Sequence, residues 1–248
     1  SEMAAFKPGW EWKAEEPFDE STYHARGRFE SRGRTFTVVA ATAPRMGMVS
    51  AAVLTAKLVH ALRPRVILMP GICAGVENRT QLGDVIFADT CWDYQSGKYS
   101  REGDNPSNFA IDPHFVNTDA ALSSHWDHLS RDQLLIQDLT SGWQAERRPP
   151  PTLRRGPIGS GSAVLADNNI VRDVLKQQRK TLAIEMELYG VFCAAASASW
   201  PRPLVCGIKA VCDFADVKKD DNVQPFAAYM SGTVSRTFME RYMAVLCP

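Results

Sequence analysis

The chain has 248 residues, of which 45% are hydrophobic and 23% are charged, so it is long enough for one α/β domain or two small ones. Its 28 Lys and Arg residues equal its 28 Asp and Glu residues, and this balance argues against general binding of nucleic acid. No run approaches the roughly 18 apolar residues of a membrane span, and no charged start followed by an apolar segment indicates a secretory signal.

The cysteines and histidines form no recognisable metal or redox motif. None of the six cysteines belongs to a CxxC pair, and most lie in apolar stretches, which favours a reducing, cytoplasmic setting. The five histidines have no acid or cysteine partners at the spacing of metal ligands. We therefore expect no metal and no organic cofactor.

The first part of the chain predicts the start of a helix and a pair of strands. Residues 2–6 are typical of a helix start, and Trp10, Trp12 and Phe18 follow in a polar loop. Strands are expected over 24–29 and 35–41, joined by a turn that contains a glycine.

A helix over 49–62 is expected to follow this strand pair. Its predicted buried face consists of Val49, Val53, Ala56 and either Val59 or His60. A strand over 66–69 then runs into a glycine loop over 70–75, and the order strand, helix, strand predicts a βαβ unit with parallel strands. Because the loop lacks GxGxxG and GK[ST], it indicates neither a dinucleotide site nor a P-loop.

The middle of the chain is less regular. A strand is expected over 83–89, and the region 92–157 is irregular and polar, with one helix around 118–126. We expect this region to be an insertion that covers one face of the sheet.

The last third returns to regular elements. A strand near 156–160 breaks into a Gly/Ser loop, and Asp167 or Asn168 is expected to cap a helix over 170–179. A long helix ends the chain. Its apolar face consists of Phe226, Met230, Val234, Phe238 and Tyr242.

Two apolar strands in this last third each end in acidic residues. The run 182–184 leads into Glu185, Met186 and Glu187, and the strand over 204–212 leads into Asp213. Because open α/β sheets present sites at the carboxyl ends of strands, we expect these carboxylates to converge from neighbouring strand ends. The structural alternative is that Glu185 and Glu187 cap the helix that follows, which accounts for one carboxylate better than for two.

Four stretches of the chain resemble, in order, the purine nucleoside phosphorylase and methylthioadenosine/S-adenosylhomocysteine nucleosidase superfamily. They are GICAG at 71–75, GDV at 83–85, AIEME at 183–187 and CDFAD at 212–216. The last two are similar to the nucleosidase motifs Val-Glu-Met-Glu and Ser-Asp-x-Ala-Asp. The resemblance covers most of 34–246 and implies an α/β fold, a three-layer α/β/α sandwich around a mixed, twisted central sheet. We expect a single domain over residues 1–248.

The resemblance implies hydrolysis of the bond between a purine and ribose. The departing purine gains negative charge, so an acid that protonates N7 accelerates the reaction, typically by about 10²–10⁴-fold. Asp213 matches this acid, and we expect its partly dehydrated carboxyl group to keep its proton. Glu187 matches the residue that binds the ribose hydroxyls, and Met186 would pack on the sugar. The other implied substrate contacts are Glu185, Val164, Leu165, Cys73, Ala74, Met46 and Cys212.

Several of these positions depart from the family pattern. Val164 stands where an aromatic residue commonly stacks on the base, and Cys212 stands where nucleosidases often have serine. The family's first strand is absent, so we expect the chain to be part of a longer protein. Glu2 then corresponds either to the family's glutamate beside the attacking water or to an exposed N-terminal acid. Arg45 stands where nucleosidases have a small residue, and either binds a phosphate or is an ordinary surface arginine.

The sequence therefore predicts a nucleosidase that acts on a small-molecule purine nucleoside or nucleotide, with adenine as the expected base. A phosphorylase and a catalytically weak nucleotide-binding module are the alternatives. The resemblance also implies a homo-oligomer and a cytoplasmic location, and related domains occur fused to sensor domains, some as antiphage effectors. The 5′ group of the substrate stays open.

Overall fold

The structure is a computed structural model that describes residues 9–100, 108–163, 168–215 and 222–248, with the backbone alone described at 108 and 168–170. Several predicted features lie outside the described residues. They are the helix start at 2–6 with Glu2, the expected base-binding residues Val164 and Leu165, Asp216 at the end of the CDFAD motif, and the side chains of the expected cap residues Asp167 and Asn168. In the described part of the chain, no helix is long and apolar enough to cross a membrane.

A mixed six-stranded sheet forms the centre of the molecule, as the family resemblance predicted. Its strands, in spatial order, are β10 (Leu153–Ser160), β11 (Ala183–Glu185), β5 (Val66–Gly75), β12 (Leu204–Asp213), β6 (Val85–Asp93) and β9 (Phe115–Asn117). β5 and β12 are parallel, whereas β11 runs antiparallel to β5. Because β10 pairs with β6 as well as with β11, the sheet closes on itself.

A small antiparallel sheet precedes the central one. It contains β1 (Glu11–Trp12), β2 (Glu16–Asp19), β3 (Thr22–Ser31) and β4 (Arg34–Ala41). The predicted strand pair is confirmed by β3 and β4, whose turn has positive φ at Arg32 (49°) and Gly33 (74°), as a type I′ hairpin requires. The prediction of a loop was wrong for Trp12 and Phe18, which lie in β1 and β2, whereas Trp10 precedes β1 outside any strand, is 9% exposed and stacks on Phe29 with ring centroids 4.4 Å apart.

The predicted βαβ unit was also wrong. β4 belongs to the small sheet and β5 to the central one, so these two strands do not pair across the intervening helix. The glycine segment 70–75 is not a loop, because it is the second half of β5 and pairs with strands on both sides.

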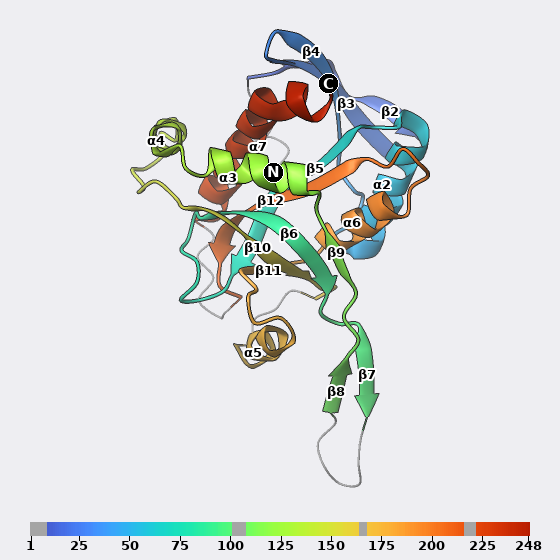
Figure 1. The fold of residues 1–248 in the computed structure, drawn as a ribbon, viewed down its shortest axis with the longest axis vertical. Coiled ribbons are helices and arrows are strands. Elements are labelled where there is room, and N and C mark those ends of the chain that lie inside the picture. The colour runs from blue at the N-terminus through green and yellow to red at the C-terminus, as the bar shows by residue number, and fades with distance from the viewer. Residues whose placement is uncertain (1–8, 101–107, 164–167, 216–221) are drawn as a thin grey trace.

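The helices lie on two sides of the central sheet (Figure 1). α2 (Met48–Leu62) and α6 (Leu188–Ala196) pack together on one side, and α3 (Ala120–Leu129), α4 (Gln133–Ser141) and α7 (Gln224–Leu246) lie on the other. α5 (Asn168–Gln177), which the sequence predicted over 170–179, lies near the end of the sheet. Consecutive side chains of β6 point to opposite faces of the sheet. Ile86 packs in the hydrophobic cluster that contains α6 (the α6 core), and Phe87 packs in the cluster that contains α7 (the α7 core).

The helix faces were predicted with mixed success. The α7 face is confirmed, because all five of its predicted apolar residues are buried. The α2 face was wrong for three of its residues, since Val49 is 78% exposed, Val53 is 52% exposed and Ala56 is exposed. Val59 is buried as predicted, together with Ala51 and Leu54. α2 is oriented by its close contact with α6, which its own hydrophobic pattern does not encode.

The region 92–157 is more ordered than the sequence suggested. It contains α3, which confirms the predicted helix, together with α4, β9 and a hairpin of β7 (Gly97–Ser100) and β8 (Asn108–Ile111) that projects from the body of the protein (Figure 1). Trp92 and Trp126 are fully buried, so parts of this region contribute to the core.

Candidate active site

The two acidic motifs meet around the end of β5. Ile184 of β11 and Asp213 of β12 are both register partners of Ala74, one from each side of the strand. The prediction that the acids come from neighbouring strand ends was therefore wrong in detail, because β5 separates β11 from β12 and β11 runs in the opposite direction. The two motif-bearing segments nevertheless come together, since Ile184 of β11 and Asp213 of β12 flank the same residue of β5.

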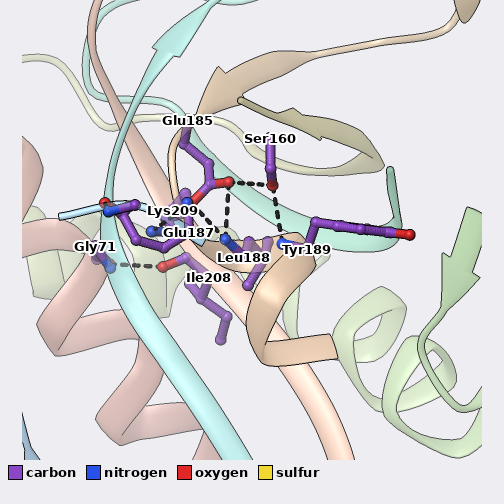
Figure 2. Close-up of polar contacts among 10 residues, drawn as sticks. Gly71, Ser160, Glu185, Glu187, Leu188, Tyr189, Ile208 and Lys209 are labelled. Carbon is purple, nitrogen blue, oxygen red and sulfur yellow. Dashed lines mark hydrogen bonds and ion pairs between the residues drawn. The ribbon is translucent and has the colours of Figure 1, made fainter. Parts of the chain in front are cut away.

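Glu185 is deeply buried and fully engaged with protein groups. Its carboxylate lies 3.1 Å from Lys209 Nζ, and both side chains are 2% exposed. It accepts hydrogen bonds from the Ser160 hydroxyl and from the backbone N–H groups of Glu187 and Leu188, both at 3.0 Å (Figure 2). Glu185 thus satisfies the first N–H groups of α6, as the helix-capping alternative describes.

Glu187 occupies the N-cap position of α6, but its side chain makes no capping hydrogen bond to that helix. Its Oε1 accepts a hydrogen bond of 3.0 Å from the backbone N–H of Gly47, the residue before α2. The two glutamates therefore differ in their surroundings, since Glu185 contacts the buried Lys209, and the partly buried Glu187 contacts Gly47 at the N-terminus of α2.

The close approach of α2 and α6 depends on Gly190. A Cβ atom at Gly190 would overlap the carbonyl oxygen of Met48 and lie 2.9 Å from its carbonyl carbon. Without a side chain there, the first turn of α2 comes close enough for Gly47 to bond to Glu187.

Asp213 ends β12 and is half-buried. Its Oδ1 accepts a hydrogen bond of 2.8 Å from the N–H of Ala215, and its Oδ2 lies 3.5 Å from the thiol of Cys212. Ala215 has a positive φ of 55°, so the Asp213 side chain helps to hold a tight turn after the strand. The carboxyl group is thereby oriented at the edge where the two motifs meet.

The remaining predicted contacts lie at different depths. Cys73 is 3% exposed, and burial raises the pKa of its thiol well above the usual value, so it acts as a small core residue. Ala74 and Met186 are half-buried, Met46 is 78% exposed and Arg45 is exposed. Within the described ranges, Arg45 makes no hydrogen bond or ion pair.

Sequence reasoning missed two polar residues of this site, Lys209 and Ser160. Lys209 is the one charged residue inside the otherwise apolar β12, a signal that pointed to a buried ion pair but did not identify its partner. Among the described residues, no group of three or more His, Cys, Asp or Glu side chains could hold a metal ion.

The family model described as "Phosphorylase superfamily" matches residues 4–241. The chain belongs to this superfamily. Solved nucleosidases of similar fold include the 5′-methylthioadenosine/S-adenosylhomocysteine nucleosidases of Streptococcus pneumoniae (TM-score 0.72, 18% identity, 96% of this chain and 94% of that one) and Helicobacter pylori (0.71, 15%, 96% and 93%). The futalosine hydrolase of Helicobacter pylori is similar too, with a TM-score of 0.69, 16% identity and coverage of 96% and 91%.

Two curated proteins are similar in sequence to this chain. The uncharacterized protein y4jS of Sinorhizobium fredii is 33% identical over 210 residues, which are 84% of this chain and 50% of that protein. The ATP nucleosidase Cap17 of Escherichia coli is 26% identical over 216 residues, which are 82% of this chain and 41% of that protein. The chain thus spans about half the length of the curated relatives it matches.

Proposed function

We propose that the protein hydrolyses the N-glycosidic bond of an adenine nucleoside or nucleotide and releases the free base. The observation that carries this proposal is that β11, which leads into Glu187, and the end of β12, which carries Asp213, flank the same residue of β5, Ala74. A carboxylate for the sugar and a carboxylic acid for the base are the two groups that this reaction needs most.

In the proposed mechanism, Asp213 donates a proton to purine N7 as the bond to ribose lengthens. Its contact with the Ala215 N–H orients the carboxyl group, and its other oxygen, which lies 3.5 Å from the Cys212 thiol, is the one that would carry the proton to the base. Glu187 accepts hydrogen bonds from the ribose hydroxyls, and Met186 packs on the sugar. Val164 and Leu165 hold the base and Glu2 orients the attacking water, by the family resemblance alone.

An adenine nucleotide is the substrate class that we favour. The relative from Escherichia coli is an ATP nucleosidase, and Arg45 is exposed, makes no ion pair in the described part of the chain, and stands two residues before Gly47. Since Gly47 donates to Glu187, Arg45 lies on the segment that contacts the residue proposed to bind the sugar. An arginine there suits a phosphate group.

A substrate panel tests the proposal. The protein is incubated with ATP, AMP, adenosine, methylthioadenosine and S-adenosylhomocysteine in phosphate-free buffer, and free adenine is measured by chromatography. Hydrolysis predicts adenine and a sugar with a free 1-hydroxyl group. A strict requirement for inorganic phosphate, with a sugar 1-phosphate as product, would establish phosphorolysis instead. Binding of these ligands without release of adenine would favour the nucleotide-binding module.

We also propose that the protein is a cytoplasmic homo-oligomer, joined to a sensor domain in a longer chain. Three exposed apolar side chains lie together in sequence around the start of α2, those of Met46, Val49 and Val53. Exposed apolar residues beside the site support a contact between subunits there. Light scattering at micromolar concentration tests this, and a monomeric mass would contradict it for these residues.

A further inference from the structure

Lys209 and Glu185 form a buried ion pair that the proposed reaction does not use directly. Lys209 lies on β12 between Ile208 and Ala210, which belong to the α7 core, so its side chain emerges on the opposite face with Val211, under α6. Both charged groups are 2% exposed. Burial of two charges is costly, and an apolar pair of similar volume often serves stability equally well. The pair therefore points to a role beyond stability.

The Glu185 carboxylate has no acceptor position left for a substrate. It receives the Ser160 hydroxyl, the backbone N–H groups of Glu187 and Leu188, and the Lys209 ammonium group. These four donors match the roughly four lone-pair sites of a carboxylate. Of the two glutamates in the motif, only Glu187 is then placed to bind ribose.

The same bonds determine where Glu187 lies. Glu185 holds the Glu187 N–H at 3.0 Å, and Gly47 donates to the Glu187 side chain at 3.0 Å (Figure 2 shows the Glu185 contacts). Ser160 also holds the start of α6, because its hydroxyl oxygen accepts a hydrogen bond of 2.9 Å from the Tyr189 N–H. The start of α6 is thus fixed by groups that themselves depend on a charged Glu185.

We infer that Lys209 is a positioning residue that acts through Glu185 to hold Glu187 in place for the ribose hydroxyls. This inference rests on the proposed function. Without Lys209, Glu185 would be a buried carboxylate with no counter-ion, and would either take up a proton or move towards water. Either change weakens its bonds to the start of α6 and displaces Glu187. Because Lys209 lies on the strand that ends in Asp213, the ion pair also links the two proposed catalytic acids across β5.

Selectivity for ribose over deoxyribose tests this role. We measure two ratios of kcat/KM, ATP to dATP and adenosine to 2′-deoxyadenosine. Each ratio reports how strongly Glu187 binds the 2′-hydroxyl group. Both substrates are measured with one enzyme sample, so a smaller folded fraction does not alter the ratio. We expect Lys209→Met and Glu187→Gln each to lower the ratio about tenfold, because a charge-assisted hydrogen bond is lost or distorted.

Two further variants complete the test. Lys57→Met removes a lysine from another ion pair, with Asp19 at 2.8 Å on the outside of α2, and is expected to leave the ratio unchanged. If Lys209→Met does not fold, the double variant Glu185→Gln/Lys209→Met removes both buried charges, and should fold yet keep a lowered ratio. Wild-type ratios in the Lys209 variants, beside a lowered ratio in Glu187→Gln, overturn the inference alone. Release of adenine from no substrate overturns the proposed function, and the inference with it.

Discussion

Replacing Asp213 with asparagine separates chemistry from stability at this site. Asparagine keeps an Oδ1 atom that can accept the 2.8 Å bond from the Ala215 N–H, so the turn after β12 should persist. What it loses is the acidic proton for N7, and the oxygen that lies 3.5 Å from the Cys212 thiol becomes an NH₂ group, a change worth about 1 kcal/mol. The expected change in melting temperature is therefore about 2–4 °C for a domain of this size.

The effect on the reaction should be much larger than the effect on stability. Loss of a general acid lowers kcat by about 10²–10⁴-fold, which corresponds to about 3–5 kcal/mol of transition-state stabilisation. KM should change little, because the amide still bonds to the base. The assay is adenine release at saturating concentrations of the best substrate from the panel, beside a thermal melt of the same sample.

Asp84 provides the matched control. It is 1% exposed and accepts bonds from the Gln81 and Thr152 N–H groups and from Arg154, so Asp84→Asn should lower the melting temperature and leave kcat nearly unchanged. Near wild-type kcat in Asp213→Asn would refute the assignment of the acid, and with it the proposed mechanism.

Three further predictions follow from the geometry of the site. Arg45→Ala should raise KM for ATP by about tenfold or more with little change for adenosine, since a charge-assisted contact is worth about 1.5–3 kcal/mol, and equal effects in steady-state kinetics would exclude a phosphate contact. Gly190→Ala places a Cβ against the Met48 carbonyl group and should separate α6 from α2. We therefore expect the free energy of unfolding, measured with denaturant, to fall by about 1–3 kcal/mol, and KM to rise. An unchanged KM would show that the Glu187 contact does not depend on this packing. Burial raises the pKa of Cys73 well above its usual value and that of Cys206 to about 12, so both thiols should resist a thiol reagent at about pH 8 until the protein unfolds, and rapid labelling of either in the native protein would contradict their burial.

The sequence by itself determined the elements whose pattern is local and the motifs that carry the chemistry. The α7 face follows from one apolar residue every helical turn, and the β3–β4 hairpin follows from two strand-forming runs around a turn glycine. The order of the four motifs was sufficient to identify the superfamily, because each motif is a short continuous segment. These features need no knowledge of which distant residues meet.

Only the tertiary structure decided how these elements meet and what each acid contacts. Glu185 and Glu187 are two residues apart and chemically identical, yet one lies against Lys209 and the other against Gly47. β11 runs antiparallel to β5, and α2 turns Val49 outward, because strand pairing and close helix contact are settled by residues far away in the chain. The strength and role of a buried charge depend on the groups that surround it in space, and a linear sequence does not state which groups these are.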